Sequence, residues 1–213
     1  MEDKSRATDT QESDFFLLIG EDIRICLTSW VKEDSQFWRR SVIRTLFSSI
    51  EAVVNNLTQR AESRHADGGC TLTPPELMVI REERYELKSN GTIQSRTAGY
   101  PFLNRLRFAF RISSKAFGLD FTPNYDDNGW ARLQEALKVR DRITHPKNVS
   151  GLVVDIEECR AMNRGMLWFQ DNVIRLYLEI ARVLNERQET LQTQLDEVNK
   201  ELAQLKEESA ESG

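Results

Sequence analysis

The chain has 213 residues, with 29 Lys or Arg against 34 Asp or Glu, which gives a formal net charge of −5. This length allows one domain with a hydrophobic core, and 39% hydrophobic with 30% charged residues excludes collagen-like, disulfide-scaffold and wholly disordered chains. Three scattered cysteines and two histidines offer no metal-binding framework, and no apolar run could span a membrane, so we expect a cytoplasmic protein without metal, cofactor or membrane partner.

Apolar residues at three- and four-residue spacing predict a succession of helices. The predicted helices span, in chain order, about 14–30, 36–62, 73–88, 101–117, 129–144 and 156 to beyond 200. Residues 1–12 lack this periodicity, are polar and acidic, unlike a secretory signal peptide, and should form a disordered leader. Residues 89–99 are rich in turn formers and leave room only for a short strand or a loop. No segment supplies the alternating strands of a sheet, so the predicted fold class is all-α.

The predicted organisation is one helical domain over 13–185, with an insertion at about 63–99, and a coiled-coil segment with an acidic tail over 186–213. Apolar residues recur in heptads from residue 181 to residue 205. The two sets of seam positions are Leu184, Leu191, Val198, Leu205 and Ala181, Gln188, Leu195, Leu202. Four heptads with one polar seam residue predict a parallel or antiparallel coiled coil, and hence a homodimer or higher oligomer. The alternative is a long helix that folds back on its own domain, but its dense polar flanks favour self-association.

One stretch, VRDRITHPK at 139–147, gathers chemically active side chains at a predicted helix end. Asp141 and His145 are four residues apart, so the carboxylate can orient the imidazole, which could then act as a general acid or base. Arg140 and Arg142 would supply positive charge with the geometry that binds phosphate. These are the parts needed to cleave a phosphodiester without a metal. The alternative is an ordinary helix C-terminus, where the helix dipole favours basic side chains.

The pattern Arg140-Asp141-x-x-x-His145 resembles the signature of the HEPN superfamily, in which an arginine and a polar residue precede a histidine by a short interval. The wider string LKVRDRITHPK and the opening SQFWRRSVIRTLFSSIEAVVNNL also look like parts of such proteins. The resemblance covers roughly 36–185 and implies an all-α bundle with the motif just before the last core helix. The insertion at 63–99 departs from the family pattern.

The resemblance also implies an activity, because members that keep the motif are commonly metal-independent endoribonucleases whose two copies face each other across a composite cleft. His145 would be the acid or base for attack of a ribose 2′-hydroxyl on the adjacent phosphate, Arg140 would stabilise the phosphate, and Asp141 would orient His145. Auxiliary phosphate contacts outside the signature would be Arg142, Thr144 and Lys147. Such domains are common in toxin and anti-phage defence systems, which implies an antitoxin or another defence protein as a partner.

Charge distribution agrees with RNA as the substrate. Residues 96–147 hold ten basic and five acidic side chains, a balance of about +5. Arg107 and Arg111 are four residues apart and would form one basic ridge beside the motif helix, unless they belong to a solvated helix face. Two further readings stay open. One is a HEPN-like module that binds nucleotide, RNA or protein without catalysis and oligomerises through its coiled coil; the other is a purely structural helical adaptor.

Overall fold

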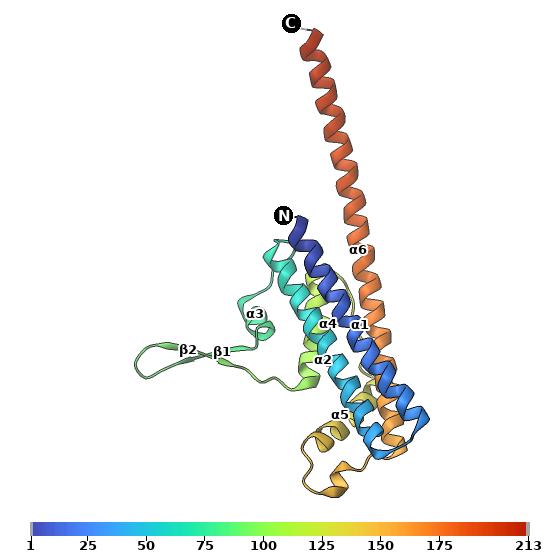
Figure 1. Cartoon of the computed structure of the whole chain (residues 1–213). Helices are drawn as coiled ribbons and strands as arrows, with labels where there is room; N and C mark the ends of the chain where they lie inside the picture. The colour runs from blue at the N-terminus through green and yellow to red at the C-terminus, as the bar shows by residue number, and fades with distance from the viewer. Residues whose placement is uncertain (1, 212–213) are drawn as a thin grey trace.

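The computed structural model describes the backbone of residues 2–211 and the side chains of residues 17–201. Its elements are α1 (Glu2–Lys32), α2 (Gln36–Ala66), α3 (Pro74–Ile80), β1 (Glu83–Leu87), β2 (Ile93–Thr97), α4 (Phe102–Phe117), α5 (Asn128–Thr144), the 3-10 helix η1 (Val149–Leu152) and α6 (Ile156–Glu211). The all-α prediction is confirmed, with one small hairpin as the only sheet in the described chain. Figure 1 shows the helices bundled around the lower part of α6, whose upper part rises alone, while the β1–β2 hairpin projects sideways.

The hydrophobic core lies between α2, α4, α5 and the lower part of α6. The largest fully buried side chains are Phe47, Phe110, Phe169, Ile43, Ile50, Leu57, Leu106, Ile112, Leu133, Ile143, Met162 and Leu176. Helix α5 approaches α6 so closely that a Cβ atom added at Gly165 would lie 2.7 Å from the Cα of Leu133. This close packing, which needs a glycine, fixes α5 and therefore the position of its C-terminal end, where the candidate motif lies.

Local signals set most helix ends as predicted. Ser35 caps the start of α2 through its side chain, and Asp127 does the same for α5. Gly118 ends α4 in the left-handed conformation, at φ 69°, where a residue without a Cβ is favoured. Helix α5 ends at Thr144, because His145 precedes Pro146 and a residue before a proline avoids the helical conformation.

The helix predicted to run from 73 to about 88 is wrong in its second half. Helix α3 ends at Ile80, and Glu82 takes a positive φ of 52°, which breaks the helical path. Strand β1 then pairs antiparallel with β2, so that Leu87 lies opposite Ile93. The predicted capping box at Thr73 and Glu76 is confirmed. The end of α3 depends on the pairing of β1 with β2, which the spacing of apolar residues along a helix does not reveal.

The disordered leader predicted for residues 1–12 also differs from the structure. Residues 2–12 are helical and form the beginning of α1, while residue 1 lies outside the described chain. No proline or glycine separates these polar residues from the amphipathic part of α1, so the helix continues through them. Across the described part of the chain, none of the helices has both the length and the apolar character that a membrane crossing requires.

Candidate functional site

The motif predicted from the sequence lies at the C-terminal end of α5. Arg140 and Asp141 are in the last turn and a half of this helix, and His145 follows it as the cap residue. The backbone N–H of His145 donates to the carbonyl oxygen of Asp141 at 3.0 Å. Thr144 donates its hydroxyl to the carbonyl of Arg140 at 2.7 Å, and Lys147 lies exposed in the following loop. The structure therefore keeps these residues in one place, at one edge of the bundle.

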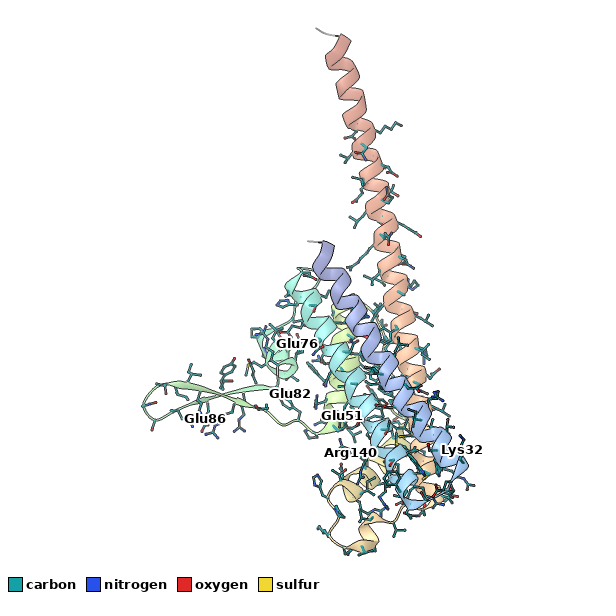
Figure 2. All side chains as sticks on the ribbon, viewed as in Figure 1. Lys32, Glu51, Glu76, Glu82, Glu86 and Arg140 are labelled. Carbon is teal, nitrogen blue, oxygen red and sulfur yellow. The ribbon has the colours of Figure 1, made fainter. Side chains whose placement is uncertain are left out.

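Arg140 is held between two carboxylates. Its Nη2 forms an ion pair with Glu51 of α2, and its Nη1 donates to Asp141 Oδ1 at 3.0 Å. Figure 2 shows Glu51 and Arg140 together where α2 passes the end of α5. The guanidinium also lies 5.7 Å from the ring centroid of Phe47, a cation–π contact. With only 26% of its side chain exposed, Arg140 presents a fixed rather than a freely moving charge.

Glu51 is the residue of this site that sequence reasoning missed. It lies 89 positions before Arg140, in a helix that was read only for its apolar spacing. A local motif search has no signal for such a partner, since the contact exists only once α2 and α5 pack together. Glu51 matters because a carboxylate on Arg140 competes with any phosphate that would bind there.

His145 is exposed at the surface, and its ring faces solvent beyond the end of α5. Among the described side chains, the carboxylate of Asp141 makes its hydrogen bond to Arg140 rather than to this ring. The expected Asp141–His145 contact is thus replaced by a neighbouring Arg140–Asp141 contact. The exposed imidazole of His145 is accessible to a substrate from solvent.

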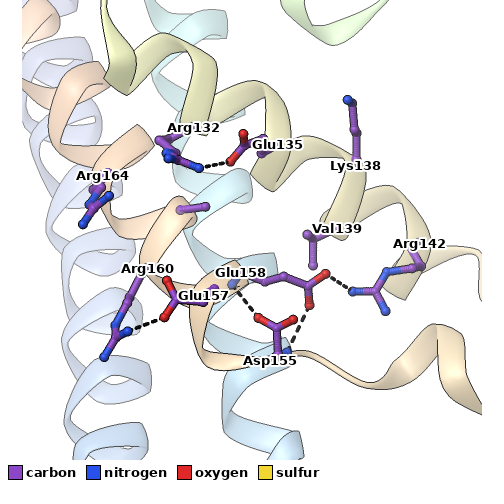
Figure 3. A pocket seen from close by; sticks show the side chains of 11 residues that line it. Arg132, Glu135, Lys138, Val139, Arg142, Asp155, Glu157, Glu158, Arg160 and Arg164 are labelled. Atoms are coloured by element: carbon purple, nitrogen blue, oxygen red, sulfur yellow. Dashed lines mark hydrogen bonds and ion pairs between the residues drawn. The ribbon is translucent and has the colours of Figure 1, made fainter.

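Arg142 points away from this group, because residues two apart on a helix do not share a face. Its Nη1 donates to the carbonyl of Val153 at 2.6 Å, and its Nη2 donates to Glu158 Oε1 at 2.6 Å. Figure 3 shows the Arg142–Glu158 pair at the edge of a cavity of about 410 Å³ between α5 and α6. Arg142 therefore joins α5, the following loop and α6, and it lies on a different face of α5 from Arg140.

The loop after His145 is held by basic residues of α2. Arg44 donates to the carbonyl of Ile143 at 2.7 Å, and Arg40 donates to the carbonyl of Leu152 at 3.0 Å. Arg39 donates to the carbonyl of Val154 at 2.9 Å. Carbonyl groups that the end of α5 and the loop leave without helical partners are thus satisfied from α2. These arginines lie near the start of α2, and they position the loop that follows the motif.

The predicted basic ridge of Arg107 and Arg111 lies elsewhere. The Arg107 guanidinium stacks 4.9 Å from the ring of Trp130, which is about 15 Å along α5 from Arg140 at the rise of a helix. Burial raises the pKa of the neighbouring Tyr125 to about 12, although the charge of Arg107 opposes this shift. Arg111 forms an ion pair at 3.5 Å with Glu76 of α3. The structure therefore does not bring these two arginines to the motif.

Two further findings concern metal binding and similarity to known proteins. Within residues 17–201, no cluster of three or more His, Cys, Asp or Glu residues is arranged to hold a metal ion. Comparison of the chain with protein families, with curated proteins and with solved structures finds no match.

Proposed function

We propose that this protein is a metal-independent endoribonuclease of the HEPN type, acting in a toxin or anti-phage defence system. The observation that carries the proposal is the juxtaposition at the end of α5 of an exposed His145 and a fixed Arg140, with the spacing and helix-end position of the HEPN signature. The all-α bundle, in which the motif precedes the last long helix, supports the same assignment.

The proposed chemistry uses the two side chains in turn. His145 accepts the proton of a ribose 2′-hydroxyl, whose oxygen attacks the adjacent phosphorus while the bond to the 5′-oxygen breaks. The departing oxygen takes up a proton from the His145 of a second copy, across the composite cleft that the resemblance implies. Arg140 stabilises the negative charge that grows on the phosphate oxygens. The products are a 2′,3′-cyclic phosphate and a free 5′-hydroxyl, and DNA is not cleaved because it lacks the nucleophile.

Glu51 gives this site a resting state. While no RNA is bound, the Glu51 carboxylate neutralises Arg140, so an incoming phosphate has to displace it or share the guanidinium with it. A Glu51→Gln substitution removes the competing charge and keeps the shape of the side chain. We expect this variant to bind RNA about tenfold more tightly, in line with the loss of one charge-assisted contact.

The test is cleavage of total RNA in EDTA, followed by analysis of the product ends. The His145→Ala variant should lose about 100-fold or more of the rate, and Arg140→Ala should lose a similar amount. Arg182→Ala is the matched arginine control, since Arg182 is exposed on α6 and its ion pairs among the described residues are with Glu179 and Glu186 of its own helix. Cleavage that survives both His145→Ala and Arg140→Ala, or that yields ends other than a cyclic phosphate, would sink the proposal.

A second candidate function is a non-catalytic module of the same type that binds nucleotide, RNA or protein. The observation in its favour is that Arg140 already has two carboxylate partners, Glu51 and Asp141, so its charge is compensated before any ligand arrives. In this case RNA binding depends on Arg140, no RNA is cleaved under any condition, and His145→Ala leaves RNA affinity unchanged.

A further inference from the structure

The upper part of α6 carries an apolar stripe that the rest of the described chain leaves uncovered. Lower on this helix, Leu176 and Ile180 are buried in the core. Further up, the stripe continues on the same face but is open to solvent. The exposed fractions are 42% for Leu184, 65% for Leu191, 53% for Leu195 and 51% for Val198. The stripe is therefore the core-facing side of α6, extended beyond the core that would cover it.

This stripe forms one wall of a groove of about 770 Å³ at the upper end of the bundle. Ile180, Leu184, Leu191 and Leu195 line the groove from α6, and Phe117 at the end of α4 closes its floor. The lining residues come from the ends of α2 and α4 and from α6 at 180–195, where α6 rises past the other helices in Figure 1. The α6 side of the groove thus combines these four apolar residues with the polar Arg187, Gln188 and Gln192.

Basic residues surround the floor of the groove. Arg60, Arg64 and Arg187 line it, with Asp67 as the acidic member of the lining. The Arg64 guanidinium lies over the ring of Phe117 at 4.8 Å, and its Nε donates to a backbone carbonyl at 2.8 Å. Its buried Nη2 has no hydrogen-bond acceptor within the described residues. Because three arginines and one aspartate line the groove, it favours an occupant that brings carboxylates.

The position of the stripe excludes a parallel pairing of two α6 helices along it. In a parallel pair, the partner helix would run down the same side of α6 from Leu195 past Ile180. That side is already filled by Phe117 and the core. An antiparallel partner brings only the last residues of its helix to the level of Ile180, whereas a parallel partner would bring its own core there.

We infer that the groove binds the C-terminal part of α6 from a second copy of this chain, in an antiparallel pair. The register that uses all four heptads places Leu191 against Leu195 of the second copy, and Leu184 against Leu202 of the second copy. The same register brings Arg187 beside Glu201 of the second copy. Opposite charges at such flanking positions select partner and orientation.

Charge complementarity also favours this occupant. Residues 196–211, which would enter the groove, carry six acidic and two basic side chains. In the inferred register, the acidic residues that follow Leu205 of the second copy reach the level of Arg60 and Arg64. The acidic end of each helix thus meets the basic floor of the other copy, and the twofold symmetry satisfies both grooves at once.

The first experiment measures assembly of the full chain, without RNA, by light scattering over a range of concentrations. Leu191→Asp should weaken dimerisation by about 1000-fold, because each dimer loses two buried leucine contacts. Leu178→Asp is the matched control: Leu178 is on the same helix and has the same 65% exposure, but it lies outside the groove. A monomeric wild-type chain, or equal weakening by both substitutions, would overturn the inference.

The second experiment measures orientation by electron–electron distances between spin labels on a single introduced cysteine, Ser209→Cys, after replacement of Cys26 and Cys70 by serine. In the antiparallel pair, residue 209 lies level with Tyr177 of the second copy, so the two labels are about 48 Å apart along the axis. A parallel pair places them within about 20 Å. The short distance would contradict the inference even if the chain is dimeric.

This inference does not rest on the ribonuclease proposal. The antiparallel pair places the two His145 residues at opposite ends of the assembly, so a composite cleft would use a separate surface and a further copy. RNA cleavage that survives Leu191→Asp, together with a halved particle mass, would show that the two surfaces are distinct.

Discussion

The lower and upper parts of α6 carry the same apolar repeat but lie in opposite surroundings. Leu176 in the lower part is fully buried in the core, whereas Leu191 in the upper part is 65% exposed. The lower end of α6 is also tied to α5 through Arg142 and Glu158, while the upper end rises past its neighbours. Periodicity thus predicts that a helix has an apolar face, and the tertiary structure decides whether anything in the same chain covers that face.

The largest expected difference between the two parts concerns these two leucines. Leu176→Ala should lower the free energy of unfolding by about 3 kcal/mol, because it leaves a cavity in the core. Leu191→Ala should change only the part of the stability that depends on protein concentration. Urea denaturation at two protein concentrations measures both effects. Equal losses of unfolding free energy for the two variants at every concentration would contradict the difference in burial between the lower and upper parts of α6.

The next prediction concerns the Arg142–Glu158 pair, which connects α5 to the lower end of α6. Arg142→Ala should cost about 2 kcal/mol, since Glu158 and the carbonyl of Val153 lose their charged donor. The control is Arg160→Ala, whose pair with Glu157 is exposed and three residues away on the same helix. That substitution should cost less than about 0.5 kcal/mol. If the two variants lose the same stability by urea denaturation, Arg142 is not a tether.

A smaller effect concerns Glu76 near the upper end of the bundle. Burial of its carboxyl alone would raise its pKa, but the hydrogen bond from Lys115 at 2.6 Å and those from Thr73 outweigh burial and lower the pKa to about 2. A depressed folded-state pKa stabilises the protein above the ordinary value of 4.5, and this stabilisation is lost as the pH falls towards 2.

Glu76→Gln should therefore reduce stability by on the order of 2 kcal/mol at neutral pH and by little near pH 2. Chemical denaturation from pH 7 to pH 2 measures this difference. A constant gap between the variant and the wild type across this range would mean that the Glu76–Lys115 pair does not contribute through ionisation.

The smallest expected effect on stability is at the motif itself. His145→Ala should change the free energy of unfolding by less than about 0.5 kcal/mol, because the side chain is exposed beyond the end of α5. Thermal and urea denaturation check this. The result also makes the RNA cleavage test interpretable, since a variant that loses activity but keeps its stability has lost chemistry and not its fold.

The candidate site shows which contacts a short sequence pattern predicts and which it does not. The spacing from Arg140 to His145 and the proline after it are sufficient to predict a motif at a helix end, and the structure places it there. The same spacing predicted a contact between Asp141 and His145, but Asp141 is bound to Arg140. The other carboxylate partner of Arg140, Glu51, lies on α2, far away in the sequence. The contact with Glu51 exists only because α2 packs against α5, which is why the pattern of nine consecutive residues at 139–147 does not reveal it.

The fold likewise has features that local sequence signals predict and features that depend on tertiary contacts. Capping residues, glycine, proline and apolar spacing act within one or two turns, so the sequence by itself determined that α2, α4 and α5 are helices and where α4 and α5 end. The end of α3 depended on the pairing of Leu87 with Ile93, which joins separate segments. The role of Arg142 as a tether and the uncovered stripe of α6 were likewise decided by tertiary structure alone. Both depend on which surfaces meet, and hydrophobic burial and ion pairing act between elements that only the folded chain brings together.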